Sequence, residues 1–254
     1  MKRIYRTSIL VVLIALPLFV IPASTQNPAP TGVLRLRVRV KIGETSKGLA
    51  RKRFYLIKGT LEQNRAILDA AKDKSVITRD CFYSKLGASP ALIDWLKAGD
   101  CESIYCREVE PESLKTVPEF ATAYVAAEKE YGNAEIGRKW LSNNIQPELR
   151  DGFYRQRQNV LQDLLKQAEA QSGAPVLSVM TDRNGTAYFT DLTPGNYVLT
   201  NLLPDEVGPA MASWNCDVQI KPGDIATEKP YQVSNRKDKN VKCVAVEEPL
   251  PACK

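Results

Sequence analysis

The chain has 254 residues, of which 44% are hydrophobic and 25% are charged, a composition typical of a globular protein with one large domain or two small ones. It contains no histidine, and 35 lysines and arginines against 29 aspartates and glutamates give a formal net charge of +6. The absence of histidine excludes Ser-His-Asp and Cys-His catalytic sites and every metal site that needs an imidazole ligand.

Residues 1–25 predict an export signal. One lysine and two arginines precede an apolar run over residues 9–21. The run has the length of the apolar region of a signal peptide and is shorter than the ~20 residues that span a bilayer. The alternative is an uncleaved anchor, against which Pro17 in the middle of the run argues. Cleavage would remove three cations and leave a periplasmic or secreted protein with a net charge near +3, whose only membrane contact is the signal before cleavage.

Six cysteines follow this segment: Cys81, Cys101, Cys106, Cys216, Cys243 and Cys253. An even number of cysteines in an oxidising compartment favours disulfides over free thiols. We predict a bond between Cys216 and Cys243, because both fall on the apolar side of predicted strands in one sheet-forming region. Cys101 and Cys106 have a spacing that zinc sites allow, but no histidine and no second matched pair accompany them. We therefore expect no metal and no cofactor.

Residues 32–59 predict the first strands of a sheet. From Val33 onward, apolar and basic residues alternate, which is typical of a strand with one buried and one exposed face. The apolar positions are Leu34, Leu36, Val38 and Val40, and the basic positions are Arg35, Arg37, Arg39 and Lys41. After a turn-rich segment, residues 53–57 predict a second strand.

Residues 60–173 change to a helical period and predict an all-helical block. Thr60 and Gln63 have the spacing of a capping box at its start. Prolines mark the starts of three later helices and glycines mark their ends: Pro90 to Gly99, Pro118 to Gly132 and Pro147 to Gly173.

After Gly173 the strand pattern returns and continues to residue 248. Residues 182–185, Asp-Arg-Asn-Gly, predict a hairpin turn between neighbouring strands. A second turn at 192–195 and further short strands bring the expected total to about seven, of which two precede the helices.

A run of residues around these turns resembles the signature of the carboxypeptidase regulatory-like family, a prealbumin-like β-sandwich related to Cna B-type repeats. The residues that carry the resemblance are Asp182, Gly185, Ala187, Phe189, Leu192, Pro194, Gly195, Tyr197 and Leu199. Glycines stand where turns need conformational freedom, and the apolar residues supply an inward face. The resemblance implies a fold but no activity, because such sandwiches serve many purposes.

Together these patterns predict an α+β protein: a prealbumin-like antiparallel β-sandwich of about seven strands, with a helical subdomain inserted between the second and third strands. The expected segments are a signal peptide over 1–25, a discontinuous sandwich over 32–59 and 174–248, a helical insertion over 60–173 and a C-terminal tail over 249–254. Surface loops tolerate such insertions at modest entropic cost.

The row formed by Arg35, Arg37, Arg39 and Lys41 is the main candidate site. Alternate side chains of a strand stand about 7 Å apart, so the row is about 20 Å long and fits an anionic envelope polymer or acidic partner. The alternatives are a solvated face that discourages edge pairing, or a row neutralised by acidic residues of the insertion. No aromatic residues interleave with the row, which argues against nucleic acid.

Two other groups of residues are candidates for function. Paired carboxylates can hydrolyse glycosides without histidine, and the acidic candidates are Glu108, Glu110, Glu112, Glu128, Glu130 and Glu135. Exposed tryptophans could stack on sugar rings, but we expect Trp95, Trp140 and Trp214 to lie in the core.

We therefore expect a non-enzymatic, exported binding or structural module of the cell envelope or extracellular space, acting on an envelope component or a protein partner. The alternative is a carboxylate-based hydrolase of an envelope or extracellular polysaccharide.

Overall fold

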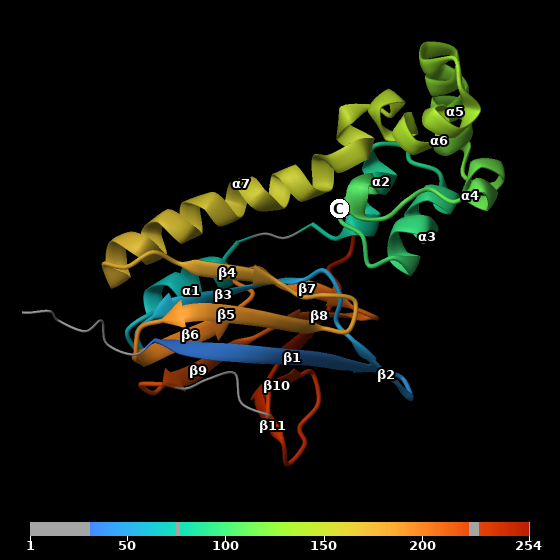
Figure 1. The fold of residues 1–254 in the computed structure, drawn as a ribbon. Helices are drawn as coiled ribbons and strands as arrows, with labels where there is room; N and C mark the ends of the chain where they lie inside the picture. Colours follow the sequence, from blue (N-terminus) through green and yellow to red (C-terminus); the bar gives the residue numbers. More distant parts are fainter. Residues whose placement is uncertain (1–30, 75–76, 224–228, 254) are drawn as a thin grey trace, which may run out of the picture.

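The computed structural model of the chain describes residues 31–74, 77–223 and 229–253, so the predicted export signal lies outside the described residues. The described part is a mixed α+β protein with seven α-helices and twelve strands. Helix α7 (Pro147–Ser172) runs across the strands, while most of the preceding helices gather at one of its ends (Figure 1). Within the described ranges, no helix is both long enough and apolar enough to cross a bilayer.

Nine strands form two sheets that face each other across a shared core. The first sheet contains β1 (Gly32–Ile42), β2 (Thr45–Gly48), β5 (Thr186–Leu192), β10 (Tyr231–Ser234) and β11 (Val241–Val244). The second contains β3 (Arg53–Lys58), β4 (Leu177–Met180), β6 (Gly195–Thr200) and β9 (Asn215–Ile220). A smaller sheet contains β7 (Asp205–Val207), β8 (Ala210–Ser213) and β12 (Val246–Pro249).

The predicted inward face of β1 is confirmed. Its apolar residues Leu34, Leu36, Val38 and Val40 are all buried in the core between the sheets. Trp214 is fully buried there, as expected, and its ring lies 5.7 Å from the ring of Phe54 in β3. Such an aromatic pair stabilises the sandwich by about 1 kcal/mol beyond the burial of its surface.

Three details of the predicted sandwich are wrong. Twelve strands are present where about seven were expected. The pairings of β1 with β10 and of β10 with β11 are parallel, because alternation specifies which face of a strand is buried but not its direction. The helices lie between the third and fourth strands, because the polar strand β2 has no alternating pattern by which it could be recognised.

The expected hairpin at residues 182–185 is also wrong. The turn is present, and the Asp182 side chain accepts hydrogen bonds from the backbone of Asn184 and Thr186. However, β4 pairs with β3 and β5 pairs with β1, so the turn connects the two sheets instead of two paired strands. Gly185 has φ +75°, and a Cβ atom there would lie 2.1 Å from the Val38 carbonyl oxygen, so only glycine fits.

Seven helices fill the region between β3 and β4: α1 (Arg65–Lys72), α2 (Arg79–Lys85), α3 (Pro90–Ala98), α4 (Pro111–Thr116), α5 (Pro118–Tyr131), α6 (Ala134–Trp140) and α7. The predicted starts at Pro90, Pro118 and Pro147 are confirmed. Thr60 and Gln63 form the reciprocal bonds of a capping box, although α1 itself begins only at Arg65. We refer to residues 60–173 as the insert.

Helices α1 and α7 cover the outer face of the second sheet. Leu161 and Leu164 of α7 join Tyr55 and Ile57 of β3 in a buried cluster with residues of α1. The middle of strand β3 is therefore buried on both faces, which explains why residues 54–57 are continuously hydrophobic instead of alternating. The far end of α7 belongs to a separate core within the insert, so this helix connects the two parts of the molecule.

The expectation that all three tryptophans are buried is wrong for Trp140. Trp95 is buried and packs edge-on against Phe120, but Trp140 is 48% exposed. Helix α6 packs on α5 through Gly137, where a Cβ atom would lie 2.9 Å from the Glu128 amide nitrogen.

Three disulfides connect the molecule. Cys216 of β9 is bonded to Cys243 of β11, the pairing favoured by the sequence, and this bond ties one sheet to the other. Cys101 is bonded to Cys106 within the insert. The third bond joins Cys81 of α2 to Cys253, so the C-terminal segment is anchored to the insert (Figure 1).

Candidate anion-binding face

The basic row of β1 lies on the outer face of the first sheet. Its core-facing neighbours are buried, so the side chains of Arg35, Arg37, Arg39 and Lys41 project from the opposite face. Arg37 lies beside Thr186 of β5 and Gln232 of β10, and Arg39 lies beside Ser234. These neighbouring strands therefore place polar, uncharged residues next to the cations.

The acidic residues of the insert do not neutralise this row. Glu108 pairs with Arg138 and Glu112 pairs with Lys115, both inside the insert. Within the described part of the chain, the ion pair made by the row joins Lys41 to Glu44 at 3.4 Å, and both side chains are strongly exposed. Exposed pairs of this kind contribute about 0–1 kcal/mol, so the row keeps most of its positive potential.

The connection between β10 and β11 adds a second group of cations to the same face. The connection carries Arg236, Lys237 and Lys239, the adjoining strand β11 carries Lys242, and all four side chains are exposed. Together with Arg35, Arg37, Arg39 and Lys41 they form what we call the basic face. The second group was not among the residues predicted from the sequence, although three of the four residues at 236–239 are basic.

Asn235 holds this connection against β1. Its side chain is buried and donates a hydrogen bond of 2.9 Å to the Lys41 carbonyl oxygen, while its carbonyl accepts one of 2.8 Å from the Lys41 amide. The same side-chain nitrogen donates to Glu247, which also pairs with Arg236. Asn235 thus takes the place of a strand residue and brings the second group of cations beside the first.

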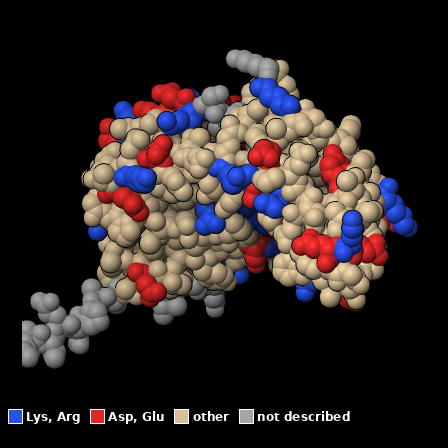
Figure 2. Space-filling view, turned by 90° about the horizontal axis from the view of Figure 1, so that it is seen from above, with Lys and Arg blue, Asp and Glu red and all other residues tan. Residues whose placement is uncertain are grey.

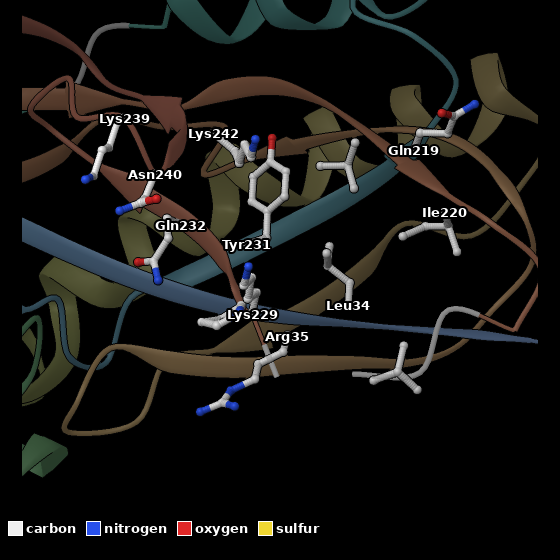
Figure 3. Close-up of a pocket in the computed structure, with 13 residues that line it drawn as sticks. Leu34, Arg35, Gln219, Ile220, Lys229, Tyr231, Gln232, Lys239, Asn240 and Lys242 are labelled. Carbon is white, nitrogen blue, oxygen red and sulfur yellow. The ribbon is translucent and has the colours of Figure 1, made fainter. Parts of the chain in front are cut away.

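Two hollows accompany the basic face. One, of about 670 Å³, has Arg39, Lys41, Arg236 and Lys237 among its lining residues. The other, of about 640 Å³, lies at the side of the sandwich between β1 and β9, with Arg35, Lys239 and Lys242 among its lining residues (Figure 3). We call the second one the β1–β9 hollow. Both have the volume of a small-ligand site.

The opposite side of the molecule has a different charge pattern. Figure 2 views the molecule from above, over α7 and the insert, and shows positive and negative residues interspersed. Mixed charges of this kind keep a surface soluble without attracting either sign of ligand. The contrast supports the basic face as a site for an anion.

A buried ionic network joins the insert to the sandwich. The Lys52 ammonium lies 3.4 Å from Glu102 and 3.7 Å from Asp205, and Arg157 of α7 pairs with the same two carboxylates at 3.5 and 3.3 Å. Next to it, Arg79 of α2 pairs with Glu206. Each buried charge has an opposite partner, which is the arrangement that makes burial of charge tolerable.

The network shifts the pKa of two of its members. Burial by itself lowers the pKa of Lys52, but Glu102 and Asp205 outweigh burial, so the pKa lies above its ordinary value of 10.5. Burial raises the pKa of Glu102, but Lys52 and Arg157 outweigh it, and the pKa lies below its ordinary value of 4.5. Lys52 and Glu102 are therefore both charged at neutral pH, and their pairing makes the network a structural joint.

The acidic residues proposed from the sequence lie on the surface of the insert. Glu108, Glu110, Glu112, Glu128, Glu130 and Glu135 are all exposed. Glu130 accepts a hydrogen bond from Asn144, and the Glu108 and Glu112 pairs are described above. Among the described residues, no three acidic or cysteine side chains gather in a way that could hold a metal ion.

The residues of the predicted family motif occupy turn and core positions. Phe189, Leu192 and Tyr197 are buried in the sandwich core, and Gly195, with φ +148°, begins β6. The Tyr197 hydroxyl donates a hydrogen bond of 2.8 Å to the Thr193 carbonyl and so fixes the turn that contains Pro194. These are structural roles. No family model, no curated protein and no solved structure matches the chain.

Proposed function

We propose that this protein is an exported, non-enzymatic binding module that holds an anionic polymer of the cell envelope or extracellular space on its basic face. One observation carries the proposal: two groups of cations, almost 200 residues apart along the chain, meet on one surface, where Asn235 is bonded to Lys41 across 194 positions. The acidic residues paired to this face are Glu44 and Glu247, and Asp238 lies in the same connection.

The proposed location follows from the cysteines. Three disulfides indicate an oxidising, extracellular environment. We extend this to export through the predicted signal at residues 1–25, followed by its cleavage and release of the mature chain to the periplasm or the outside.

We propose further that the two facing sheets are a prealbumin-like sandwich of the carboxypeptidase regulatory-like type, made of residues 32–59 and 174–248. In support, the motif residues around Gly185 and Gly195 form turns between the sheets, and the apolar residues among them point into the core. The helical insertion over 60–173 and the tail over 249–254 are then additions to that sandwich.

A long anion fits the basic face better than a compact one. The row on β1 extends along the strand for about 20 Å, and the second group of cations runs beside it. Repeated phosphate, sulfate or carboxylate groups could contact several cations at once, and such contacts add up while each remains weak.

The alternative function, hydrolysis of a polysaccharide, requires two facing carboxylates with one of them free to transfer a proton. The buried carboxylates that come together are Glu102 and Asp205, and both are held by Lys52 and Arg157. Their pairing supports a structural role and favours binding over catalysis.

The test uses the oxidised mature chain and measures its binding to dextran sulfate, with neutral dextran and double-stranded DNA as comparison ligands. We expect dextran sulfate to bind at about 0.05 M salt and to be released at about 0.5 M, because at the higher salt concentration the Debye screening length falls to a few ångströms. The variant R35E/R37E/R39E should bind at least about tenfold more weakly. The milder variant R35Q/R37Q/R39Q should show an intermediate loss without placing acids side by side on one strand.

A matched control reverses three exposed cations of the insert, Lys85, Lys129 and Lys166, and changes the net charge by the same amount. The control K85E/K129E/K166E should keep most of the affinity. Equal losses in the two triple variants would show that only net charge matters and would overturn the proposal. Tighter binding to DNA than to dextran sulfate would also overturn it.

A further inference from the structure

The β1–β9 hollow opens into the interior of the sandwich. Among the described strands, β10 pairs with β1 only from Leu36 onward, so the hollow lies beside the part of β1 that precedes this pairing. On the other side, β9 is the last strand in the order of its sheet. The two sheets part along this line, and residues of the core reach the hollow.

The floor of the hollow is apolar and its rim is positive. Leu34, Val218 and Ile220 line it, and each is less than a tenth exposed and belongs to the sandwich core. The charged residues that line it are Arg35, Lys229, Lys239 and Lys242. None of the 13 lining residues drawn in Figure 3 is acidic.

Tyr231 lies between the apolar floor and the positive rim of the hollow. Figure 3 shows Lys239 and Asn240 on one side of its ring and Ile220 on the other. Its hydroxyl donates a hydrogen bond of 3.0 Å to the Asp217 carbonyl, and burial raises the pKa of this hydroxyl to about 12. The ring therefore stays neutral and extends the apolar floor toward the lysines.

Two walls of the hollow are tied to each other. The Cys216–Cys243 disulfide ties β9 to β11, two residues before Val218 and one residue after Lys242. A site whose walls are already held pays little conformational entropy when a ligand binds. The disulfide thus lowers the entropic cost of binding at these two walls.

We infer that the β1–β9 hollow binds a single-chain amphiphilic anion, with an alkyl chain against Leu34, Val218 and Ile220 and a phosphate or carboxylate head at Lys239 and Lys242. A small inorganic anion would not need the apolar floor, and a neutral lipid would not need the cations. The inference rests on the proposed function, because it names a ligand class for one end of the basic face.

Calorimetric titration of the oxidised mature chain tests the inference, with dodecyl phosphate as the probe below its micelle concentration. Butyl phosphate carries the same head on a short chain, and dodecyl maltoside carries the same chain on a neutral head. We expect dodecyl phosphate to bind at least about tenfold more tightly than either. Equal affinity for butyl phosphate would overturn the role of the floor, and equal affinity for dodecyl maltoside would overturn the role of the cations.

Variants locate the binding in the hollow. K239E/K242E should weaken dodecyl phosphate at least about tenfold, whereas the control K85E/K129E should leave its affinity unchanged. Ile220→Trp, which fills the floor, should abolish the preference for the long chain. If Ile220→Trp unfolds the chain, the same measurement is made with Val218→Phe. K239E/K242E changes only exposed residues, so this variant tests the inference without disturbing the core. Unchanged affinity in K239E/K242E would overturn the inference.

Failure of this inference is separable from failure of the proposed function. Ile220→Trp should weaken the binding of dodecyl phosphate and leave the affinity for dextran sulfate unchanged. R37E/R39E should weaken the binding of dextran sulfate and leave the affinity for dodecyl phosphate unchanged, because neither arginine lines the hollow. Sedimentation with phosphatidylglycerol vesicles separates the possible sources of the headgroup. Binding to vesicles without binding of the free amphiphile would indicate a membrane surface and overturn the inference.

Discussion

Asn235 and Lys41 exchange two hydrogen bonds across 194 residues of sequence, at 2.8 Å and 2.9 Å. This pair is the point at which the connection between β10 and β11 meets the end of β1. Together with the parallel pairing of β10 with β1, this buried amide side chain sets where the four later cations lie relative to the four on β1.

Replacement of Asn235 by alanine should lower the free energy of unfolding by about 1–3 kcal/mol, because both backbone groups of Lys41 lose a buried partner. The urea midpoint measures this change. Dextran sulfate affinity should fall as well, because the second group of cations is no longer held beside the first. The exposed Asn196 of β6, which lines neither hollow, is the control, and Asn196→Ala should leave both quantities nearly unchanged.

Stability should depend on pH through Glu102. Its pKa is lower in the folded chain than its ordinary value of 4.5, so its stabilising contribution is fully present above that value and is lost as the pH falls through the folded pKa. Lys52 acts at the other end of the scale. Its pKa is raised above 10.5, so its contribution is present below that value and is lost as the pH rises through the folded pKa.

Urea unfolding at a series of pH values checks this dependence. Glu102→Gln should be less stable than the parent chain at neutral pH and should lose less stability on acidification. Glu108→Gln, in an exposed pair with Arg138, is the control and should follow the parent curve. If the free energy of unfolding of Glu102→Gln falls with decreasing pH as steeply as that of the parent chain, Glu102 is not the cause of the loss of stability in acid.

The bond between Cys81 and Cys253 should contribute more stability than the bond within the insert. It closes a loop of 172 positions, whereas Cys101–Cys106 closes one of 5. In the chain-entropy description these loops correspond to about 5 and about 2 kcal/mol. The urea midpoints of C81S/C253S and C101S/C106S show which variant loses more stability. A larger loss of stability in C101S/C106S would contradict the prediction.

Truncation of the two tryptophans of the insert should lower the free energy of unfolding by very different amounts. Trp95 is buried against Phe120 with the Arg107 guanidinium 4.2 Å from its ring centre, so Trp95→Ala should cost about 3–5 kcal/mol. Trp140 is 48% exposed, so Trp140→Ala should change the free energy of unfolding by less than about 0.5 kcal/mol. Thermal unfolding of both variants provides the comparison, and equal losses would contradict the exposed position of Trp140.

The sequence by itself determined features that depend on neighbouring residues. Alternation along residues 33–41 identified the buried and basic faces of β1, since successive side chains of a strand point in opposite directions. Prolines and glycines marked the starts of α3, α5 and α7 and their ends, because these residues constrain the backbone locally. The Cys216–Cys243 pairing followed from the same local patterns.

The tertiary structure decided what depends on distant residues. A period of two does not reveal the direction or partner of a strand, so the parallel pairing of β10 and the placement of β4 and β5 in different sheets could not be read from it. The second half of the basic face lies far along the chain from β1, and the pairing of β10 with β1 and the Asn235 hydrogen bonds bring the halves together. The joint between Lys52 and Glu102 likewise exists only because the insert folds back on the sandwich, where burial forces opposite charges to pair.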